Sequence, residues 1–263
     1  MRTRAWHGLS GFAGYTFSKS LDDDSDGIDF NFATVAFPQN SYDLASERGP
    51  SNFDTRDRFT AAFTYALPRL GSKKRLGEGW QVNTIVTAQS GRPVPIVSAN
   101  DTSGGDPSDP SLVFASSATP ADFHQRPNLV PGQPVINSNW ESAPDTIGYL
   151  NGNAFAPPAY ATAANPQGSF GDLGRNAVYG PHFWSVDFAV TKDTPFSDRV
   201  RLQLRAELFN IFNHPNFALP DFFVDPGSSA QGLVTQTPDQ AQTNPGLGGG
   251  GPRVIQLGAK ILF

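Results

Sequence analysis

Residues 22–29 hold the densest set of side chains in this sequence that could do chemistry. They read Asp-Asp-Asp-Ser-Asp-Gly-Ile-Asp, so Asp22, Asp24 and Asp26 recur at every second position ahead of a glycine. Carboxylates in that spacing can wrap a hard cation such as calcium. The match to a full calcium loop fails, because its twelfth position is Ala33 rather than a bidentate glutamate. We favour a solvated acidic loop, with a weak calcium site as the alternative.

A glycine-rich stretch at 246–251 satisfies the spacing of a dinucleotide-binding fingerprint. Its sequence, Gly-Leu-Gly-Gly-Gly-Gly, follows no predicted strand and opens no predicted helix. Both neighbours are needed to place a pyrophosphate on a helix N-terminus. The stretch is therefore interpreted as a flexible loop.

Catalysis and resident metals find no support in the sequence. The four histidines, His7, His124, His182 and His214, lack metal-ligand spacing. Cysteine is absent, which removes thiolate ligands and cysteine nucleophiles. No Gly-x-Ser-x-Gly elbow is present, and no arrangement narrows Ser, His and Asp to a triad. We assign no catalytic, cofactor-binding or metal residue, and we expect no enzyme activity and no cofactor.

The charge balance and hydropathy exclude two further classes. Against 24 acidic residues stand 19 basic ones, and no basic cluster is large enough to follow a phosphate backbone. Nucleic acid is therefore not an expected partner. No run of 18 apolar residues exists, which excludes a transmembrane helix. A membrane β-strand stays possible, because its apolar residues stand only at alternate positions.

Six segments show that alternation, and each is longer than the ~5–6 residues usual for a soluble strand. They lie at 9–20, 57–67, 79–89, 183–193, 199–211 and 253–263. The segment at 199–211 is the clearest, with one face of Val200, Leu202, Leu204, Ala206 and Leu208 and the other of Arg201, Gln203, Arg205 and Glu207. A slip of one residue would place its cations in lipid, at about 2–4 kcal/mol each near the midplane. The pairing register is therefore well specified.

The connections between these segments are alternately long and short. They span 21–56, 68–78, 90–182, 194–198 and 212–252, and none of the 23 prolines falls inside a segment. Transmembrane barrels have long extracellular loops and short periplasmic turns. The sequence thus predicts an all-β fold, a transmembrane antiparallel β-barrel fragment of about six long strands. Tyr65, Trp80, Trp184, Phe212 and Phe263 fall at strand ends, where an aromatic girdle would place them.

Several stretches resemble the Oar-like TonB-dependent receptors, which are outer-membrane transporters. They are Tyr15–Asp22, Asn52–Phe59, Ser90–Pro93, Gly174–Asn176 and, most specifically, Arg205–Phe217. The last strand also alternates up to Phe263, a pattern that resembles the signal presented to the barrel assembly machinery. Residues 101–168 and 221–250 read as variable loop.

The resemblance implies the C-terminal part of a receptor barrel over residues 1–263, without the plug domain, the energy-coupling segment or the signal peptide. Its implied partners are outer-membrane lipid, upstream barrel strands, the plug domain, and the TonB complex through the N-terminal part. The implied function is barrel wall and ligand-facing outer loops for energised uptake of an unknown solute in the cell outer membrane. A structural or adhesive outer-membrane protein is the first alternative, and a secreted all-β binding module is the second.

Overall fold

The computed structural model describes residues 2–25, 38–40, 43–98, 125–159, 169–197, 199–224, 231–241 and 249–263. Asp26, His124 and the start of the glycine-rich stretch lie outside these residues. Among the described residues, no helix is long and apolar enough to cross a membrane. In the described ranges the two α-helices are single turns, α1 (Lys74–Gly77) and α2 (Pro238–Ala241).

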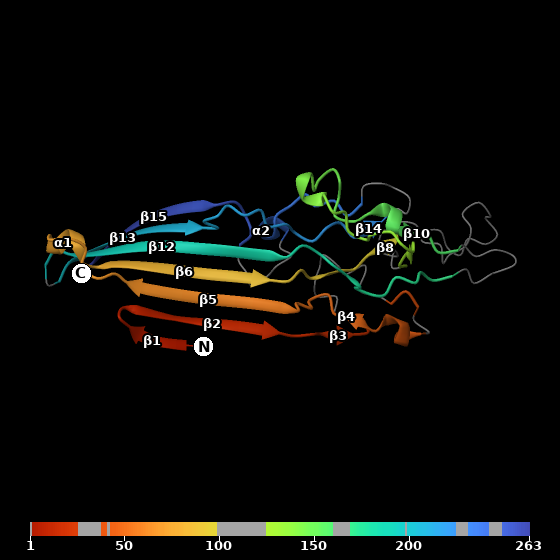
Figure 1. Cartoon of the computed structure of the whole chain (residues 1–263), viewed down its shortest axis with the longest axis horizontal. Helices are drawn as coiled ribbons and strands as arrows, with labels where there is room; N and C mark the ends of the chain where they lie inside the picture. Colours follow the sequence, from red (N-terminus) through yellow and green to blue (C-terminus); the bar gives the residue numbers. More distant parts are fainter. Residues whose placement is uncertain are drawn as a thin grey trace.

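One antiparallel sheet of seven strands dominates the molecule and confirms the predicted all-β class (Figure 1). Its order is β1 (Arg2–Trp6), β2 (Leu9–Phe17), β5 (Asp57–Ala66), β6 (Trp80–Gln89), β12 (Phe183–Pro195), β13 (Arg201–Phe209) and β15 (Val254–Leu262). The sheet is not closed, and β1 and β15 form its two edges. Each of the six alternating segments thus forms one strand.

The strand β1 was not expected from the sequence. It pairs with β2 through a two-residue turn at His7 and Gly8, whose φ angles are 49° and 87°. Two successive positive φ angles are the requirement of the type I′ hairpin turn, which matches the twist of the flanking strands. The segment before this turn was too short and too basic to show a clear alternation, so β1 escaped the prediction.

The pairing register places the apolar residues of neighbouring strands on one continuous face. Val86 lies opposite Val186, Phe188 opposite Leu208, and Ala206 opposite Leu257. On the other face, Thr64 Oγ1 donates a hydrogen bond to Asn83 Oδ1 over 2.9 Å, and Gln203 Nε2 donates to Asp193 Oδ1 over 3.1 Å. From β2 to β15 the sheet therefore has an apolar face and a polar face, as a barrel wall requires.

The long and short connections gather at opposite ends of the sheet (Figure 1). At the short-turn end lie α1 and the C-terminus. At the other end the three long connections form short two-residue strands and 3₁₀ turns: β3 (Leu21–Asp22), β4 (Gly49–Pro50), β7 (Pro93–Val94), β8 (Val97–Ser98), β9 (Asn128–Leu129), β10 (Phe155–Ala156), β11 (Val178–Tyr179), β14 (Phe223–Val224), η1 (Leu44–Glu47), η3 (Trp140–Ser142) and η4 (Gly152–Ala154). We call the described residues of 18–56, 90–182 and 210–253 the loop body.

Most of the buried apolar side chains belong to the loop body rather than to the sheet. Val94, Leu150 and Val224 are at most 1% exposed, whereas Leu257 and Ile261 on the apolar face of the sheet are 79% and 62% exposed. A water-facing sheet with such a surface would expose a large apolar patch. The apolar side chains of the sheet are thus exposed, and those of the connections are buried. In a soluble β-sandwich the apolar side chains of the sheets are the buried ones.

Candidate functional site

The second and third long connections share one apolar core. Its members are Val94, Ile96, Trp140, Tyr149, Leu150, Ala154, Phe155, Leu173, Val178, Val224 and Val234. The Trp140 ring meets the rings of Tyr149 and Phe217 edge to face, with centroids 4.9 Å apart in both pairs. Burial raises the pKa of Tyr149 to about 12, and its hydroxyl donates to the Tyr179 carbonyl over 2.7 Å. The core therefore fixes residues 90–98, 125–159, 210–224 and 231–234 relative to one another.

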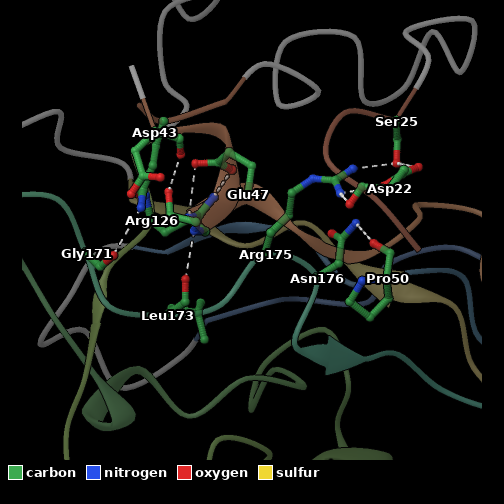
Figure 2. A network of polar contacts seen from close by, with 12 residues as sticks. Asp22, Ser25, Asp43, Glu47, Pro50, Arg126, Gly171, Leu173, Arg175 and Asn176 are labelled. Atoms are coloured by element: carbon green, nitrogen blue, oxygen red, sulfur yellow. Dashed lines mark hydrogen bonds and ion pairs between the residues drawn. The ribbon is translucent and has the colours of Figure 1, made fainter. Parts of the chain in front are cut away.

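A buried ion pair attaches the first connection to this core (Figure 2). Arg126 Nη1 donates to Glu47 Oε2 over 2.5 Å and Nη2 donates to Oε1 over 3.2 Å, so the guanidinium binds the carboxylate in a bidentate manner. The third nitrogen of the guanidinium also has a partner, because Nε donates to the Leu173 carbonyl over 2.7 Å. The side chains of Arg126 and Glu47 are 8% and 0% exposed. Such a desolvated pair holds its partners only while both charges are present.

A second arginine joins the beginning of the first connection to the end of the second. Arg175 Nη1 donates to Asp22 Oδ1 over 2.5 Å, and Nη2 donates to Ser25 Oγ over 2.6 Å (Figure 2). Burial alone would raise the pKa of the Asp22 carboxyl. Hydrogen bonds from Arg175, Ser51 and Ser25 outweigh that effect, and the pKa is lowered. Asp22 is therefore held ionised by protein donors.

Asn176, the residue after Arg175, also joins the end of the second connection to the first connection. Its Nδ2 donates to the Pro50 carbonyl and to Asn52 Oδ1, both over 2.7 Å. Asn176 has a φ of 54°, in the left-handed region where asparagine is better tolerated than most residues. The Gly174–Asn176 stretch thus ties residues 50–52 to the loop body through a conformation that few side chains could adopt.

A third cluster lies where β5 leaves the loop body. Tyr179 Oη donates to Asp54 Oδ2 over 2.8 Å, and Arg56 Nε donates to the same carboxylate oxygen over 3.1 Å. Burial opposes ionisation of Asp54, but a hydrogen bond from the Ser20 amide and those from Tyr179 and Arg56 lower its pKa. Arg92 Nη2 donates to the Asn52 carbonyl over 3.0 Å. Three stretches that carry the receptor resemblance therefore meet at one seam between sheet and loop body.

The strongest of those stretches, Arg205–Phe217, turns the chain from β13 into the loop body. Asn210, with a φ of 49°, receives the His214 amide on its Oδ1 over 3.0 Å, and its Nδ2 donates to the Gly251 carbonyl over 3.0 Å. The His214 ring stacks on the Trp184 ring with centroids 4.1 Å apart, and the centroids of the His182 and His214 rings are 6.4 Å apart. Burial and then the nearby His182 lower the pKa of His214. The motif is thus a structural corner at the end of the sheet.

A cavity of about 360 Å³ opens on the polar face beneath the loop body. Its walls are Thr87, Phe183, Ser185, Asp187, Phe209, Asn210, Asp239, Gly249, Gly250, Gly251, Pro252 and Val254. Asp187 Oδ1 accepts the Asn210 amide over 2.9 Å, and Asp239 Oδ1 accepts the Thr237 hydroxyl over 2.5 Å. The described end of the glycine-rich stretch therefore borders a polar, partly aromatic hollow at the mouth of the sheet.

The candidate residues of the sequence fare differently in the structure. Asp22 is engaged by Arg175 and Ser25, while Asp26 lies outside the described residues, so calcium binding by the acidic loop stays a hypothesis. Over the described ranges no group of three His, Asp or Glu side chains could hold a metal ion. The expectations of no enzyme activity and no cofactor stay predictions.

Sequence reasoning missed the long-range polar pairs. Arg126 and Glu47 are 79 positions apart, and Arg175 and Asp22 are 153 apart. Arg175 lies in the Gly174–Asn176 resemblance, and Asp22 lies in the Tyr15–Asp22 resemblance and in the acidic loop, but neither pattern indicated that the two residues pair. Arg126 and Glu47 carry no such signal.

Comparison with known proteins gives one match. The family model described as an outer membrane beta barrel domain matches residues 1–256. No curated protein and no solved structure matches the chain. The match accords with the long antiparallel strands and the uncovered apolar face, and it places the protein in the outer membrane. The chain therefore belongs to the outer membrane beta barrel domain family.

Proposed function

We propose that this chain forms barrel wall and ligand-facing outer loops of a TonB-dependent receptor that takes up a solute. The observation that carries the proposal is the folded loop body. Three long connections are fixed to one another by an apolar core and two arginine ion pairs, and a cavity of about 360 Å³ lies between the third connection and the polar face. Connections as long as these are usually functional when they are ordered.

Preorganisation is what a binding surface of this kind needs. Ordering a loop only when a ligand arrives costs binding free energy, and a loop that is already fixed avoids that cost. The buried Glu47–Arg126 pair and the partly buried Asp22–Arg175 pair fix the first connection before any ligand binds. In the proposed receptor the ligand meets the outer loops and the plug, and the chain itself performs no chemical step.

An adhesive or structural outer-membrane protein is the second candidate, and exposed apolar side chains on the loop body favour it. Leu44, Phe53 and Phe170 are 50%, 59% and 43% exposed. Side chains of this type at a water-facing surface mark sites of contact with other surfaces.

One experiment separates the two candidates. The gene for the chain and the gene for TonB are deleted separately in the native bacterium, and depletion of solutes from the medium and attachment to surfaces are both measured. Uptake of the same solute lost in both deletions supports the receptor. Attachment lost only in the first deletion, with every solute still depleted, supports the adhesive protein and refutes energised uptake.

A further inference from the structure

The turn between β5 and β6 carries two exposed leucines beside a cluster of cations. Leu70 and Leu76 are 51% and 67% exposed, although both sit in a hydrogen-bonded turn that includes α1. Residues 67–79 contain Arg69, Lys73, Lys74 and Arg75 against Glu78 alone. The side chains of Lys73 and Arg75 form no ion pair with any residue in the described part of the chain. An apolar surface next to uncompensated positive charge is therefore presented at the short-turn end.

Backbone hydrogen bonds hold this turn in one conformation. The Leu70 amide donates to the Gly77 carbonyl over 2.8 Å, and the Gly77 amide donates to the Lys73 carbonyl over 2.8 Å. The Leu67 amide donates to the Trp80 carbonyl over 2.9 Å, which joins the turn to the start of β6. The exposure of the leucines is thus a property of a fixed turn.

Trp80 and Lys192 attach the turn to the apolar face of the sheet. The two residues are opposite each other in the β6–β12 register, and Lys192 is in turn opposite Leu204 on that face. Trp80 Nε1 donates to the Leu76 carbonyl over 2.8 Å, so the leucine end of α1 lies beside the indole. The Lys192 ammonium lies 5.7 Å from the centre of the Trp80 ring.

Lys192 itself is satisfied within the protein. It is 7% exposed, and its Nζ donates to the Glu78 carbonyl, the Asp193 carbonyl and Thr194 Oγ1 over 2.6, 2.9 and 3.2 Å. A lysine on a lipid-facing surface bends its ammonium toward the polar boundary in this way. The Trp80–Lys192 pair therefore marks the depth at which the membrane ends, and the cations of the turn lie at that boundary.

We propose that residues 67–79 form an anchor for anionic phospholipid in the periplasmic leaflet. Leu70 and Leu76 enter the acyl region, and Lys73 and Arg75 bind the phosphate groups. Short turns of outer-membrane barrels face the periplasm, which selects this leaflet. Charge complementarity selects an anionic headgroup, because each cation near a negative lipid surface strengthens binding about 5-fold. This proposal rests on the outer-membrane location and is independent of transport.

The test counts lipids bound to the full-length chain. The chain is purified in detergent micelles, mixed with equal amounts of phosphatidylglycerol and phosphatidylcholine, and examined by native mass spectrometry. The variant Lys73→Gln/Arg75→Gln removes the two cations. The matched control, Lys19→Gln/Arg253→Gln, removes the same charge at the opposite end of the sheet. Far-ultraviolet circular dichroism selects variants that retain the β-sheet.

The expected result is a preference of the wild-type chain for phosphatidylglycerol that falls about 25-fold in the turn variant and is unchanged in the control. Leu76→Ser is expected to lower retention of both lipids alike, because it removes only the apolar contact. Equal retention of the two lipids by the wild-type chain would overturn the proposal. So would a preference that survives in the turn variant or falls equally in the control.

Discussion

Removing one partner of the buried Glu47–Arg126 pair is expected to open the loop body while the sheet stays folded. In Arg126→Met the Glu47 carboxylate, which is 0% exposed, loses both of its hydrogen bonds from the guanidinium. The Leu173 carbonyl loses the hydrogen bond that it accepts from Arg126 Nε. Stranding a buried charge costs about 3–5 kcal/mol. The double variant Glu47→Leu/Arg126→Met removes both charges, so most of that cost is expected to disappear.

The assay is protease digestion of the loop body in the membrane-embedded chain. If cleavage requires local opening, its rate follows the open population, and about 3–5 kcal/mol corresponds to a rise of about 100-fold to several thousand-fold. Arg205→Met is the matched control, because the Arg205–Glu207 pair has its arginine 51% exposed and pairs of this kind contribute about 0–1 kcal/mol. The reasoning is refuted if Arg126→Met digests like the control, or if the double variant digests as fast as the single one.

Four further outcomes are expected. Leu208→Arg, opposite Phe188 on the apolar face and away from the Lys192 boundary, is expected to lower the free energy of unfolding in phospholipid vesicles by about 2–4 kcal/mol, with Gln203→Arg on the polar face nearly neutral; equal effects in urea titrations would contradict the assignment of the faces. Gly171→Ala drives a methyl carbon into the Arg126 carbonyl oxygen and is expected to accelerate protease digestion of the loop body, whereas Gly14→Ala, whose added carbon has no neighbour within 4 Å, is expected to leave it unchanged. The pKa values of Asp22 and Asp54 are lower in the folded chain than in the unfolded one, so the unfolded state binds more protons in acid. The stabilisation from the two carboxylates is therefore present above about pH 4 and is lost as the pH falls through the lowered pKa values. The variant Asp22→Asn/Asp54→Asn is expected to show a smaller fall in the urea midpoint of unfolding below pH 4 than the wild-type chain. Fused to an export signal, the chain is expected in the outer-membrane fraction after cell fractionation, and a soluble, cooperatively folding monomer would contradict the membrane assignment.

The elements of the sheet could be predicted closely, because a strand in lipid obeys a strict rule. Every second residue must be apolar, and a charge in the wrong phase is costly, so 199–211 specified both its strand and its faces. The observed β13 is shorter at each end than the predicted segment, and at its C-terminal end the hydrogen bonds of Asn210 turn the chain into the loop body. The sequence also separated the long connections from the short ones, because proline cannot donate to the ladder and all 23 prolines fall outside the six predicted segments.

The sequence by itself therefore determined the strands, their two faces and the ends at which the long and short connections gather. It did not determine the loop body, because irregular segments have no period that relates one residue to its partner. Only the tertiary structure brought Arg126 to Glu47 and Arg175 to Asp22, and buried Tyr149 and the valines of the long connections in one core. The physical reason is that lipid on one face and the polar interior on the other decide the polarity of each residue in a membrane strand. A buried ion pair depends instead on a partner that is far away along the chain.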